Sequence, residues 1–540
     1  MNHTQQQSYD AIIVGAGLAG LSCAVFLSQS GKRILLIEKN AELGGLVHSF
    51  NRDGFVFDAG ARAILGVVLN MLKELKLEVE VVPSKVSLGV EDHIILIDDA
   101  SSVMDYRDLL KKMYPDRTEE IDHFIRAMVK IMKLIDIIYG IDNPLFKDIP
   151  GDKSYLLKEL LPWLPKFLYA MNRMEALSEP CEEYVQDLVQ DQGLADIIAQ
   201  HFFKGTPAFF ALSYFTLYRS YVYPKGGTGA VTEALAKKIR EHQGEILTNT
   251  VIRQVQADRQ VVVDDQGMEY RYRNLVWAAD LKTLYDITEL GSLSPAVKRR
   301  VEDRKTQIAQ GKPSESVFSL YLGVDLPVDY FKKALIGHLF YTPSRKGLGS
   351  IHRNELTQLL EKWEQLEKGE ILSWLSRFLK YNTFEISIPA VRDSSLAPEG
   401  KTGLIISVLM EAELFKKVDA SGWYEEFRIE IENTILRILS ESLFPELKDR
   451  VERQFSFTPL SIEKRVGSTD GAIVGWSFQA HIPVIDQMRK VNQSIRTPIP
   501  NVFQVGQWAY SPAGTPTCII TGKLAADQIA KKDKGRSGPG

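Results

Sequence analysis

The apolar positions near the start of the chain change period from strand to helix and back to strand. Ala11–Val14 is a short apolar run typical of a buried strand, and the following residues have helical spacing until Gly31. A second buried strand is expected over Ile34–Ile37, and it ends at Glu38. We therefore predict a strand–helix–strand unit, which is typical of α/β proteins with a parallel sheet.

Beyond this unit, the period of the apolar positions separates strand-like from helical stretches. Residues 86–98 predict a hairpin that turns at Glu91 and Asp92, and residues 104–224 are mostly helical until Tyr223–Gly227 ends the last helix. Apolar runs rich in Val, Ile and Phe after residue 300 are expected to form a second sheet that walls a substrate cavity. The other expected strands cover 244–255, 315–325, 385–391 and 403–410, and the other expected helices cover 228–241, 353–370 and 421–450.

The order of strand, glycine and helix recurs near the C-terminus. Val502–Val505 predicts a strand that Gly506 ends, and a turn over Pro512–Gly514 precedes a helix over Thr515–Ile529. The tail from Lys531 is charged and rich in glycine, so we expect it to be disordered. The chain therefore has a second strand-to-helix corner, far in sequence from the first.

Glycines in the first corner have the spacing of a dinucleotide-binding loop. Gly15 permits a tight turn, Gly17 lets backbone N–H groups approach a pyrophosphate, and Gly20 lets the helix pack on the sheet. The N-terminus of that helix presents free N–H donors and a partial positive charge to phosphates. Glu38, at the tip of the second strand, can accept hydrogen bonds from ribose hydroxyls and disfavours a 2′-phosphate. This motif alone does not separate FAD from NAD.

Length and composition limit the class of protein. The chain has 540 residues, beyond the roughly 250–300 residues at which a single core stops growing, so we expect at least two domains. Its composition, 45% hydrophobic and 25% charged, is ordinary for a globular protein. The net charge of −4 argues against a nucleic-acid partner, which usually requires a basic surface.

Cysteines and apolar runs indicate the compartment. Cys23, Cys181 and Cys518 are widely spaced and odd in number, so they predict neither a disulfide framework nor a metal site. We expect these cysteines to be small buried side chains and the protein to lie in the reducing cytoplasm. The polar segment Met1–Ser8 lacks the features of a signal peptide. No apolar run reaches the length of a membrane-spanning helix, although a protein on the membrane surface is still compatible with the sequence.

The segment after Glu38 carries a resemblance to a known group. Lys39 is followed by Leu43-Gly44-Gly45 and then by Gly54-Phe55-x-Phe57-Asp58-x-Gly60, which resembles the extended dinucleotide motif of the flavin amine oxidase and phytoene desaturase superfamily. This resemblance implies FAD as the cofactor. Leu46 stands where that group usually has Arg, and an Arg occurs instead at Arg62.

Three later segments extend the resemblance. Pro224–Val255 is similar to a superfamily segment whose valine contacts the adenine, which points to Val251, and Leu275–Asp280 is similar to a strand that ends beside the cofactor. The phrase SIPAVRDSSLAPEGKTGL is similar to an element of the phytoene desaturase group, with Ser394 in place of Pro. In the C-terminal corner, Gln507 replaces the usual Asp. The chain is thus similar to carotenoid desaturases, carotenoid isomerases and retinol saturases, and the changes at Leu46 and Gln507 favour an isomerase-like or saturase-like relative.

The resemblance implies a fold and a set of cofactor residues. We expect an α/β (α+β) protein with a discontinuous Rossmann-like FAD-binding domain at 1–85, 225–290 and 495–530. A mixed-sheet substrate domain at 86–103 and 300–494, a helical cap at 104–224 and a disordered tail at 531–540 complete the expected organisation. The residues expected at FAD are Gly15, Ala16, Gly17, Leu18, Ala19, Gly20, Glu38, Lys39, Gly44, Gly45, Leu46, Gly60, Ala61, Arg62, Val251, Ala279, Gly506, Gln507, Gly514, Thr515, Pro516 and Thr517.

The reaction implied by the resemblance is hydride transfer between a long apolar isoprenoid or polyene and flavin N5. Desaturation, saturation and isomerisation all remain open, and the electron partner is expected to be external: a quinone, oxygen or a reductase. No acid–base cluster stands out in the sequence. Tyr510 is the first candidate for the group that handles a proton, followed by His481 and Lys312.

An apolar substrate agrees with the aromatic residues of the helical region between 155 and 224. In the same region, Leu160–Pro165, with Trp163 between Lys158 and Lys166, is a candidate for contact with a membrane surface. One alternative is a flavin amine oxidase that releases peroxide, in which Trp508 and Tyr510 would form part of an aromatic cage. Another alternative is an FAD-bound protein without enzymatic activity.

Overall fold

The computed structural model describes residues 8–147, 149–332 and 335–536. Its first sheet contains the strand–helix–strand unit. β1, β2, β10, β13 and β20 run parallel, and β12 and β11 extend the sheet with antiparallel pairing. Along the sheet the order is β10 (Glu245–Leu247), β2 (Ile34–Ile37), β1 (Ser8–Val14), β13 (Glu269–Trp277), β12 (Val261–Asp264), β11 (Ile252–Gln256) and β14 (Thr288–Glu289), with β20 (Val502–Gln504) on the end of β13.

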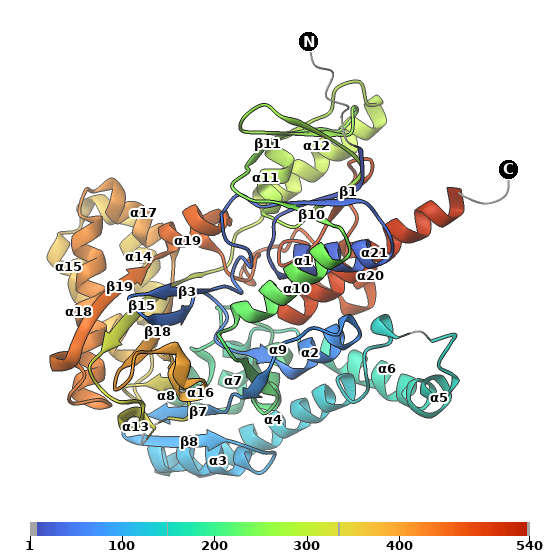
Figure 1. Ribbon diagram of the computed structural model, residues 1–540. Coiled ribbons are helices and arrows are strands. Elements are labelled where there is room, and N and C mark those ends of the chain that lie inside the picture. Colours follow the sequence, from blue (N-terminus) through green and yellow to red (C-terminus); the bar gives the residue numbers. More distant parts are fainter. Residues whose placement is uncertain (1–7, 148, 333–334, 537–540) are drawn as a thin grey trace.

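Three helices from distant parts of the chain cover one face of this first sheet. α1 (Leu18–Gln29) packs against both α10 (Gly229–Glu241) and α21 (Thr515–Arg536), and the three lie side by side in Figure 1. α1 is buried almost all round, which explains its apolar sequence. The N-termini of α1 and α21 therefore belong to one layer, although about 500 residues separate them.

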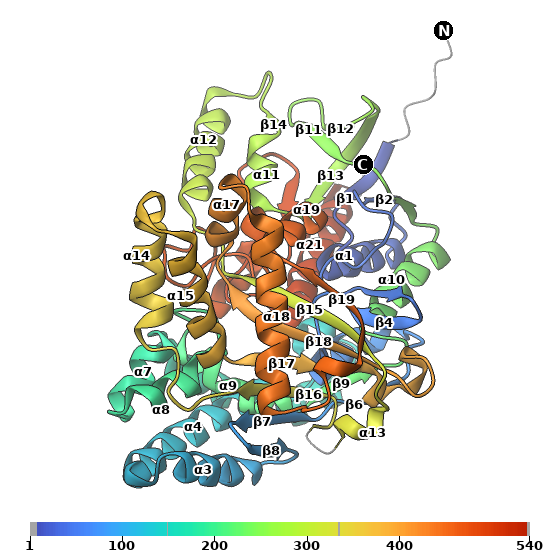
Figure 2. The same cartoon turned by 90° about the vertical axis from the view of Figure 1, so that its left-hand side faces the viewer.

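The second sheet packs one face against an apolar core that it shares with helices, and its other face points toward the interior of the molecule. It is antiparallel except between β16 and β7. Its outer face packs on α15 (Lys368–Tyr381) and α18 (Tyr424–Ser442), which cross in front of the strands in Figure 2. Its order is β19 (Val451–Phe457), β15 (Ser316–Val324), β18 (Thr402–Met410), β17 (Phe384–Ser387), β16 (His338–Thr342), β7 (Val86–Val90) and β8 (His93–Ile97).

Two small sheets connect the large ones. β3 (Ser49–Arg52) pairs with β4 (Phe55–Asp58), and β9 (Tyr221–Pro224) lies between β5 (Ile64–Leu65) and β6 (Val81–Pro83). Asp58 is fully buried where they meet, and its carboxylate accepts hydrogen bonds from Tyr223 Oη at 2.8 Å and Thr228 N at 2.8 Å. The element Gly54–Gly60 is thereby fixed against the start of α10.

A helical layer closes the lower side of the molecule in Figure 1. It contains α3 (Ser102–Met113), α4 (Thr118–Ile138), α6 (Leu161–Glu175), α7 (Cys181–Leu188), α8 (Gln192–Ala199) and α9 (Ala208–Tyr218), and within the described residues no helix is long and apolar enough to cross a membrane. The remaining helices are α2 (Gly66–Leu72), α5 (Lys153–Tyr155), α11 (Leu281–Asp286), α12 (Pro295–Gln310), α13 (Val328–Phe331), α14 (Leu356–Glu361), α16 (Pro389–Arg392), α17 (Ala412–Ala420), α19 (Pro459–Val466) and α20 (Val491–Ser494).

The α/β fold class is confirmed, and four expected elements are corrected. The single strand expected over 244–255 is two strands, because Asn249 adopts φ 52° and its N–H turns to donate to Asn40 O at 3.1 Å. The strand expected over 385–391 ends at Ser387, and a short helix begins at Pro389. The helix expected over 353–370 is broken before α15, and α18 ends at Ser442 rather than at 450.

The disordered tail expected from Lys531 was also wrong where the structure describes it. α21 continues through Lys531 to Arg536, and residues 537–540 lie outside the described residues. Ile529 is fully buried at the last inward-facing turn, so the helix is already nucleated when the charged residues are reached.

Candidate cofactor and substrate site

The first corner is shaped by a close approach between helix and loop. A Cβ atom at Gly20 would lie 1.9 Å from Gly15 O, so only glycine lets α1 begin so near the turn. A Cβ atom at Gly17 would meet nothing within 4 Å among the described residues. Gly17 therefore borders open space at the N-terminus of α1, where a phosphate would be held by free N–H groups and the helix dipole.

A second glycine loop packs on the first. Gly44 N donates to Ala16 O at 2.8 Å, and Gly44 adopts φ 111°, which L-residues with side chains rarely do. A Cβ atom at Gly44 would lie 2.3 Å from Val47 O. The backbones of the two loops are thus held in direct contact without intervening side chains.

Glu38 lies buried between these loops. One of its carboxylate oxygens accepts a hydrogen bond from Ala16 N at 2.8 Å, and the other accepts from Asn40 N at 3.0 Å. The side chain also lines the main cavity. Its position at the end of β2 is the place where a ribose hydroxyl can donate to a carboxylate.

The second corner contributes the N-terminus of α21. Thr517 Oγ1 accepts from Gly514 N at 3.0 Å, and Thr521 Oγ1 accepts from Gly506 N at 3.0 Å, so the turn before the helix is held from within. Gln507 lines the cavity, and its amide Nε2 donates to Ala472 O at 3.4 Å. Gln507 therefore has a protein partner of its own where an Asp had been expected from the resemblance.

One cavity of about 730 Å³ joins these loops. All of the residues expected at FAD line this cavity except Ala16 and Gly20, which belong to the first glycine loop but do not face the cavity. Val251 lines it from the turn between β10 and β11. The three separated segments of the chain therefore meet at a single site.

The cavity also has polar groups that suit an anionic dinucleotide. Among the described residues, Arg62 Nε and His48 Nε2 are buried without a hydrogen-bond partner, and both side chains line the cavity. Arg62 Nη1 donates to Asp58 O and its Nη2 donates to Ser407 Oγ at 2.9 Å, so the guanidinium is fixed between the first loops and the second sheet. Together with the two helix N-termini, this donor set fits FAD.

The same cavity extends into an aromatic arm. Tyr214, Tyr218 and Phe340 are linked by ring contacts, with centroids 5.8 Å apart for Tyr214–Tyr218 and 5.4 Å apart for Tyr218–Phe340. Burial raises the pKa of Tyr214 to about 12, so the phenol stays neutral. We define the aromatic arm as Phe202, Phe203, Phe210, Tyr214, Tyr218, Tyr221 and Phe340.

The inner face of the second sheet supplies the polar groups of this arm. Glu385 and His338 both line the cavity, and His338 Nε2 lies in a hydrogen bond of 2.9 Å with Glu385 Oε1. Tyr221 stacks on His338, with an interplanar angle of 20°. The opposite face of the same strands is buried in the core of the second sheet.

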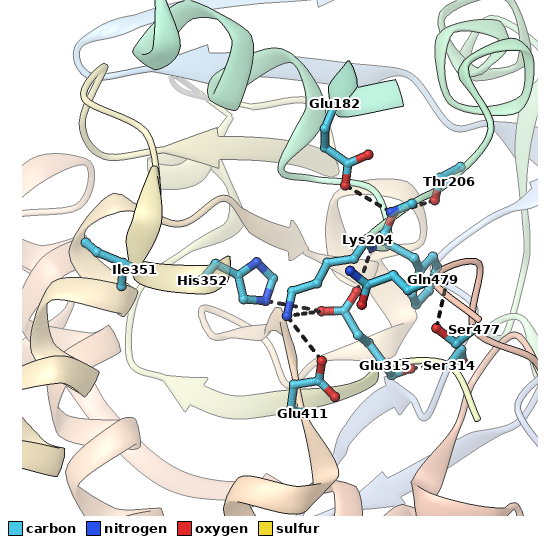
Figure 3. A network of polar contacts seen from close by, with 12 residues as sticks. Glu182, Lys204, Thr206, Ser314, Glu315, Ile351, His352, Glu411, Ser477 and Gln479 are labelled. Atoms are coloured by element: carbon cyan, nitrogen blue, oxygen red, sulfur yellow. Dashed lines mark hydrogen bonds and ion pairs between the residues drawn. The ribbon is translucent and has the colours of Figure 1, made fainter. Parts of the chain in front are cut away.

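A buried ionic cluster holds the loop that carries the arm between α8 and α9 (Figure 3). Glu315 Oε2 accepts from Lys204 N at 2.7 Å, and Lys204 Nζ donates to Glu411 Oε1 at 3.1 Å. His352 Nε2 lies 3.2 Å from Glu315 Oε1, and Glu182 accepts from Gly205 N at 3.0 Å. Because Glu315 and Glu411 lie at the ends of β15 and β18, the cluster ties the arm to the second sheet.

The three residues proposed from the sequence for proton transfer lie elsewhere. Tyr510 is buried, and its backbone forms an isolated parallel β-bridge with Ile485, whereas His481 and Lys312 are exposed. Within the described part of the chain, none of the three lines the main cavity. Trp508 does line it, with its ring at right angles to Trp476, so Trp508 and Tyr510 do not face the cavity as a pair.

Sequence reasoning missed the polar pair in the aromatic arm. Glu385 stands between Phe384 and Ile386, and a charged residue in an otherwise apolar run was the signal available. His338 belongs to β16, which no sequence pattern indicated. The pair forms only because β16 and β17 are neighbours in the second sheet.

Comparison with known proteins agrees with this geometry. The family described as flavin containing amine oxidoreductase matches residues 18–530. The chain belongs to this family. Its cofactor is FAD, and it is an oxidoreductase of the flavin amine oxidase superfamily.

Relatives of known function are distant but match over nearly their whole length. All-trans-retinol 13,14-reductase of Danio rerio is 22% identical over 584 aligned residues, which cover 97% of this chain and 88% of the relative. The 4,4′-diapophytoene desaturase of Staphylococcus aureus strain COL is also 22% identical, with 96% of this chain and 98% of the relative covered.

Solved structures share the fold. An oxidoreductase from Methanosarcina mazei aligns with a TM-score of 0.60 at 15% identity, over 97% of this chain and 100% of the other. Putrescine oxidase bound to putrescine aligns with a TM-score of 0.57 at 15% identity, over 97% of this chain and 99% of the other. At this level of identity, the alignments establish the fold alone.

Proposed function

We propose that this oxidoreductase transfers hydride between FAD and the C–C or C=C bonds of a long apolar isoprenoid or polyene. The observation that carries the proposal is the continuity of one cavity from the dinucleotide loops into the aromatic arm. The names of the retinol reductase and diapophytoene desaturase relatives support a substrate of this class.

The chain's own residues would bind and orient such a substrate. When bound, FAD supplies a flavin N5 that accepts or donates hydride. Aromatic rings of the arm remove apolar substrate surface from water, which contributes about 25 cal/mol per Å². The ionic cluster around Lys204 keeps those rings in one arrangement, so that a reacting bond is positioned and water is excluded.

Amine oxidation is the competing function, because putrescine oxidase and cyclohexylamine oxidase share the fold. An uncompensated anion in the arm would favour an ammonium substrate. Glu385 is the carboxylate that lines the arm within the described residues, and it is paired with His338 and lies in the field of Arg62 and Arg392. These positive neighbours oppose the binding of a cation, which favours the apolar substrate.

We also propose that α6 contacts a membrane surface from which the substrate is taken. Leu157, one turn before α6, and Leu161, Leu164 and Leu168 of α6 follow the helical spacing of one face and stay exposed, with exposed fractions of 63%, 50%, 41% and 47%. Tyr169 is exposed beside them. Lys158 and Lys166 are exposed in the same segment, so it also carries positive charge that anionic lipid headgroups would attract.

Product analysis with the FAD-loaded enzyme tests the proposed reaction. All-trans-retinol and 4,4′-diapophytoene in detergent micelles would be incubated with oxidised enzyme and, separately, with dithionite-reduced enzyme under anaerobic conditions. The expected result is a polyene changed by two hydrogens or by isomerisation, with its direction set by the flavin's redox state. Peroxide release with putrescine, spermine or benzylamine, together with unchanged polyenes, would overturn the proposal in favour of amine oxidation.

A further inference from the structure

The geometry of the aromatic arm points to Glu385 as the group that exchanges a proton with the substrate, with His338 as its positioning residue. This inference rests on the proposed function, since it assigns the second hydrogen of that reaction. It differs from the sequence-based candidates, which lie outside the cavity.

The strand register places Glu385 on the cavity side of the second sheet. Along β17, Phe384 and Ile386 are fully buried in the core shared with α15 and α18, so Glu385 points the other way. Its partner across the strands is Phe340, a residue of the aromatic arm, and His338 pairs with Ser387. The carboxylate is therefore surrounded by rings that would hold the substrate.

Exposure distinguishes the roles of the two members of the pair. The Glu385 side chain is 31% exposed and the His338 side chain 2% exposed, while both belong to the wall of the same cavity. The carboxylate thus presents surface to the cavity, and the imidazole lies behind it. Tyr221, stacked on the imidazole, and the hydrogen bond of 2.9 Å fix the orientation of the pair.

The charges around Glu385 keep it ionised. Burial opposes ionisation, but the hydrogen bond with His338 and the positive charges of Arg62 and Arg392 outweigh it, so the pKa of Glu385 is lowered. The phenols of Tyr214, Tyr218 and Tyr221 also face this carboxylate and are kept neutral by burial, which raises the pKa of each. At neutral pH the group is a base.

The chemical step balances with this base. In desaturation, one substrate carbon would lose a hydride, which bound FAD would accept, and the nearby carboxylate would stabilise the resulting allylic cation. The adjacent carbon then loses a proton to a Glu385 oxygen, and the electron pair of that C–H bond becomes the new π bond. The substrate has lost two hydrogens, one as hydride and one as proton, and the carboxylic acid returns its proton to water. Saturation uses the same atoms in reverse, with Glu385 protonated first.

The test compares Glu385→Gln and Glu385→Asp with the surface variant Glu78→Gln, whose carboxylate pairs with exposed Lys237. We expect kcat for polyene conversion to fall about 10²–10⁴-fold in Glu385→Gln, with KM and FAD content nearly unchanged, and to recover partly in Glu385→Asp. The acid limb of the kcat–pH profile, which reports the carboxylate, should disappear in Glu385→Gln. Glu78→Gln should match the wild type.

A readout without turnover examines the positioning of His338. With histidine labelled by ¹⁵N, the imidazole N–H that is hydrogen-bonded to the carboxylate should move upfield in Glu385→Gln, while polyene binding to the oxidised enzyme persists. Wild-type kcat with an intact acid limb in Glu385→Gln would overturn the role of Glu385 and leave the proposed function standing. Absence of polyene conversion by the wild type would overturn the proposed function and this role together.

Discussion

The two ends of the cavity recognise their occupants by different means. The dinucleotide end consists mostly of backbone, with loops that touch at Gly44 and Ala16 and, at α1, a helix N-terminus without a side-chain cap. The aromatic arm consists of side chains from the loop between α8 and α9, from α9, from β9 of a small sheet and from β16 of the second sheet. A backbone site needs particular residues at fixed spacing, whereas a side-chain site needs distant elements to pack together. The backbone site can therefore be predicted from the sequence, whereas the side-chain site cannot.

The largest expected effects distinguish glycines of the dinucleotide loops that contact the cofactor from glycines that maintain the fold. Gly17→Ala adds a Cβ where nothing lies within 4 Å, so we expect normal folding but a loss of FAD affinity of at least tenfold, because the methyl group occupies the phosphate position. Gly20→Ala places its Cβ 1.9 Å from Gly15 O and should destabilise the fold itself, by about 1–3 kcal/mol or more.

Flavin absorbance per protein and thermal unfolding of the FAD-free protein measure the two effects separately. Gly369→Ala, at an exposed site in α15 with no neighbour within 4 Å among the described residues, is the control. It should leave the FAD content unchanged and raise the stability slightly, by about 0.5–1 kcal/mol, because alanine favours a helix. Equal loss of stability in Gly17→Ala and Gly20→Ala would mean that Gly17 shapes the loop rather than bordering the cofactor.

This contrast extends to what the sequence could predict. Gly20 and Glu38 contact Gly15 and Ala16, which belong to the same strand–helix–strand unit, and the bounds expected for β2 agree with the structure. The break at Asn249 was missed because it depends on a hydrogen bond to the backbone of Asn40, far away in sequence. Short-range periodicity carries no information on such contacts.

The aromatic arm illustrates the same limit more strongly. The aromatic residues of the helical region were visible, but Trp163, Phe209 and Phe215 could not be separated from Phe202 and Phe210, which line the cavity. Which aromatic residues line the cavity depends on how α9 is oriented against the second sheet. The role of His338 could not be predicted, because its strand β16 forms only by pairing with β17 on one side and β7 on the other.

A second prediction concerns the ionic cluster that holds the arm. Glu315→Gln should lower the free energy of unfolding by about 1–3 kcal/mol at pH 7, because a buried anion that accepts from Lys204 N and faces its ammonium is lost. Burial opposes ionisation of Glu315, but His352 and Lys204 outweigh it and lower its pKa to about 2.

The sign of the pH dependence follows from that lowered pKa. The stabilisation by ionised Glu315 is complete above its unfolded-state pKa of 4.5 and is lost as pH falls toward about 2. Urea titrations of wild type and Glu315→Gln should therefore converge across this range, with Glu78→Gln as the surface control. A difference between wild type and variant that stays constant from pH 7 to pH 2 would contradict the ionised cluster.

A smaller effect is expected from the leucine stripe of α6. The double variant Leu161→Glu/Leu164→Glu should bind vesicles of phosphatidylcholine and phosphatidylglycerol about tenfold less than wild type, because two apolar side chains are lost from the interface. Met268→Glu, at an exposed residue remote from α6 in sequence, is the matched control. Vesicle flotation measures both, and equal binding by the three proteins would exclude α6 as the contact.

The joining of an FAD site to an apolar arm is tested most directly by a single-turnover measurement. The oxidised enzyme would be mixed anaerobically with 4,4′-diapophytoene or, in parallel, with putrescine, and the flavin absorbance near 450 nm followed in time. The dithionite-reduced enzyme would be mixed with all-trans-retinol in the same way. We predict that a polyene changes the flavin's redox state, by bleaching in the first case or by recovery of the absorbance in the second, and that putrescine has no effect. Bleaching by putrescine with no response to either polyene would contradict the account.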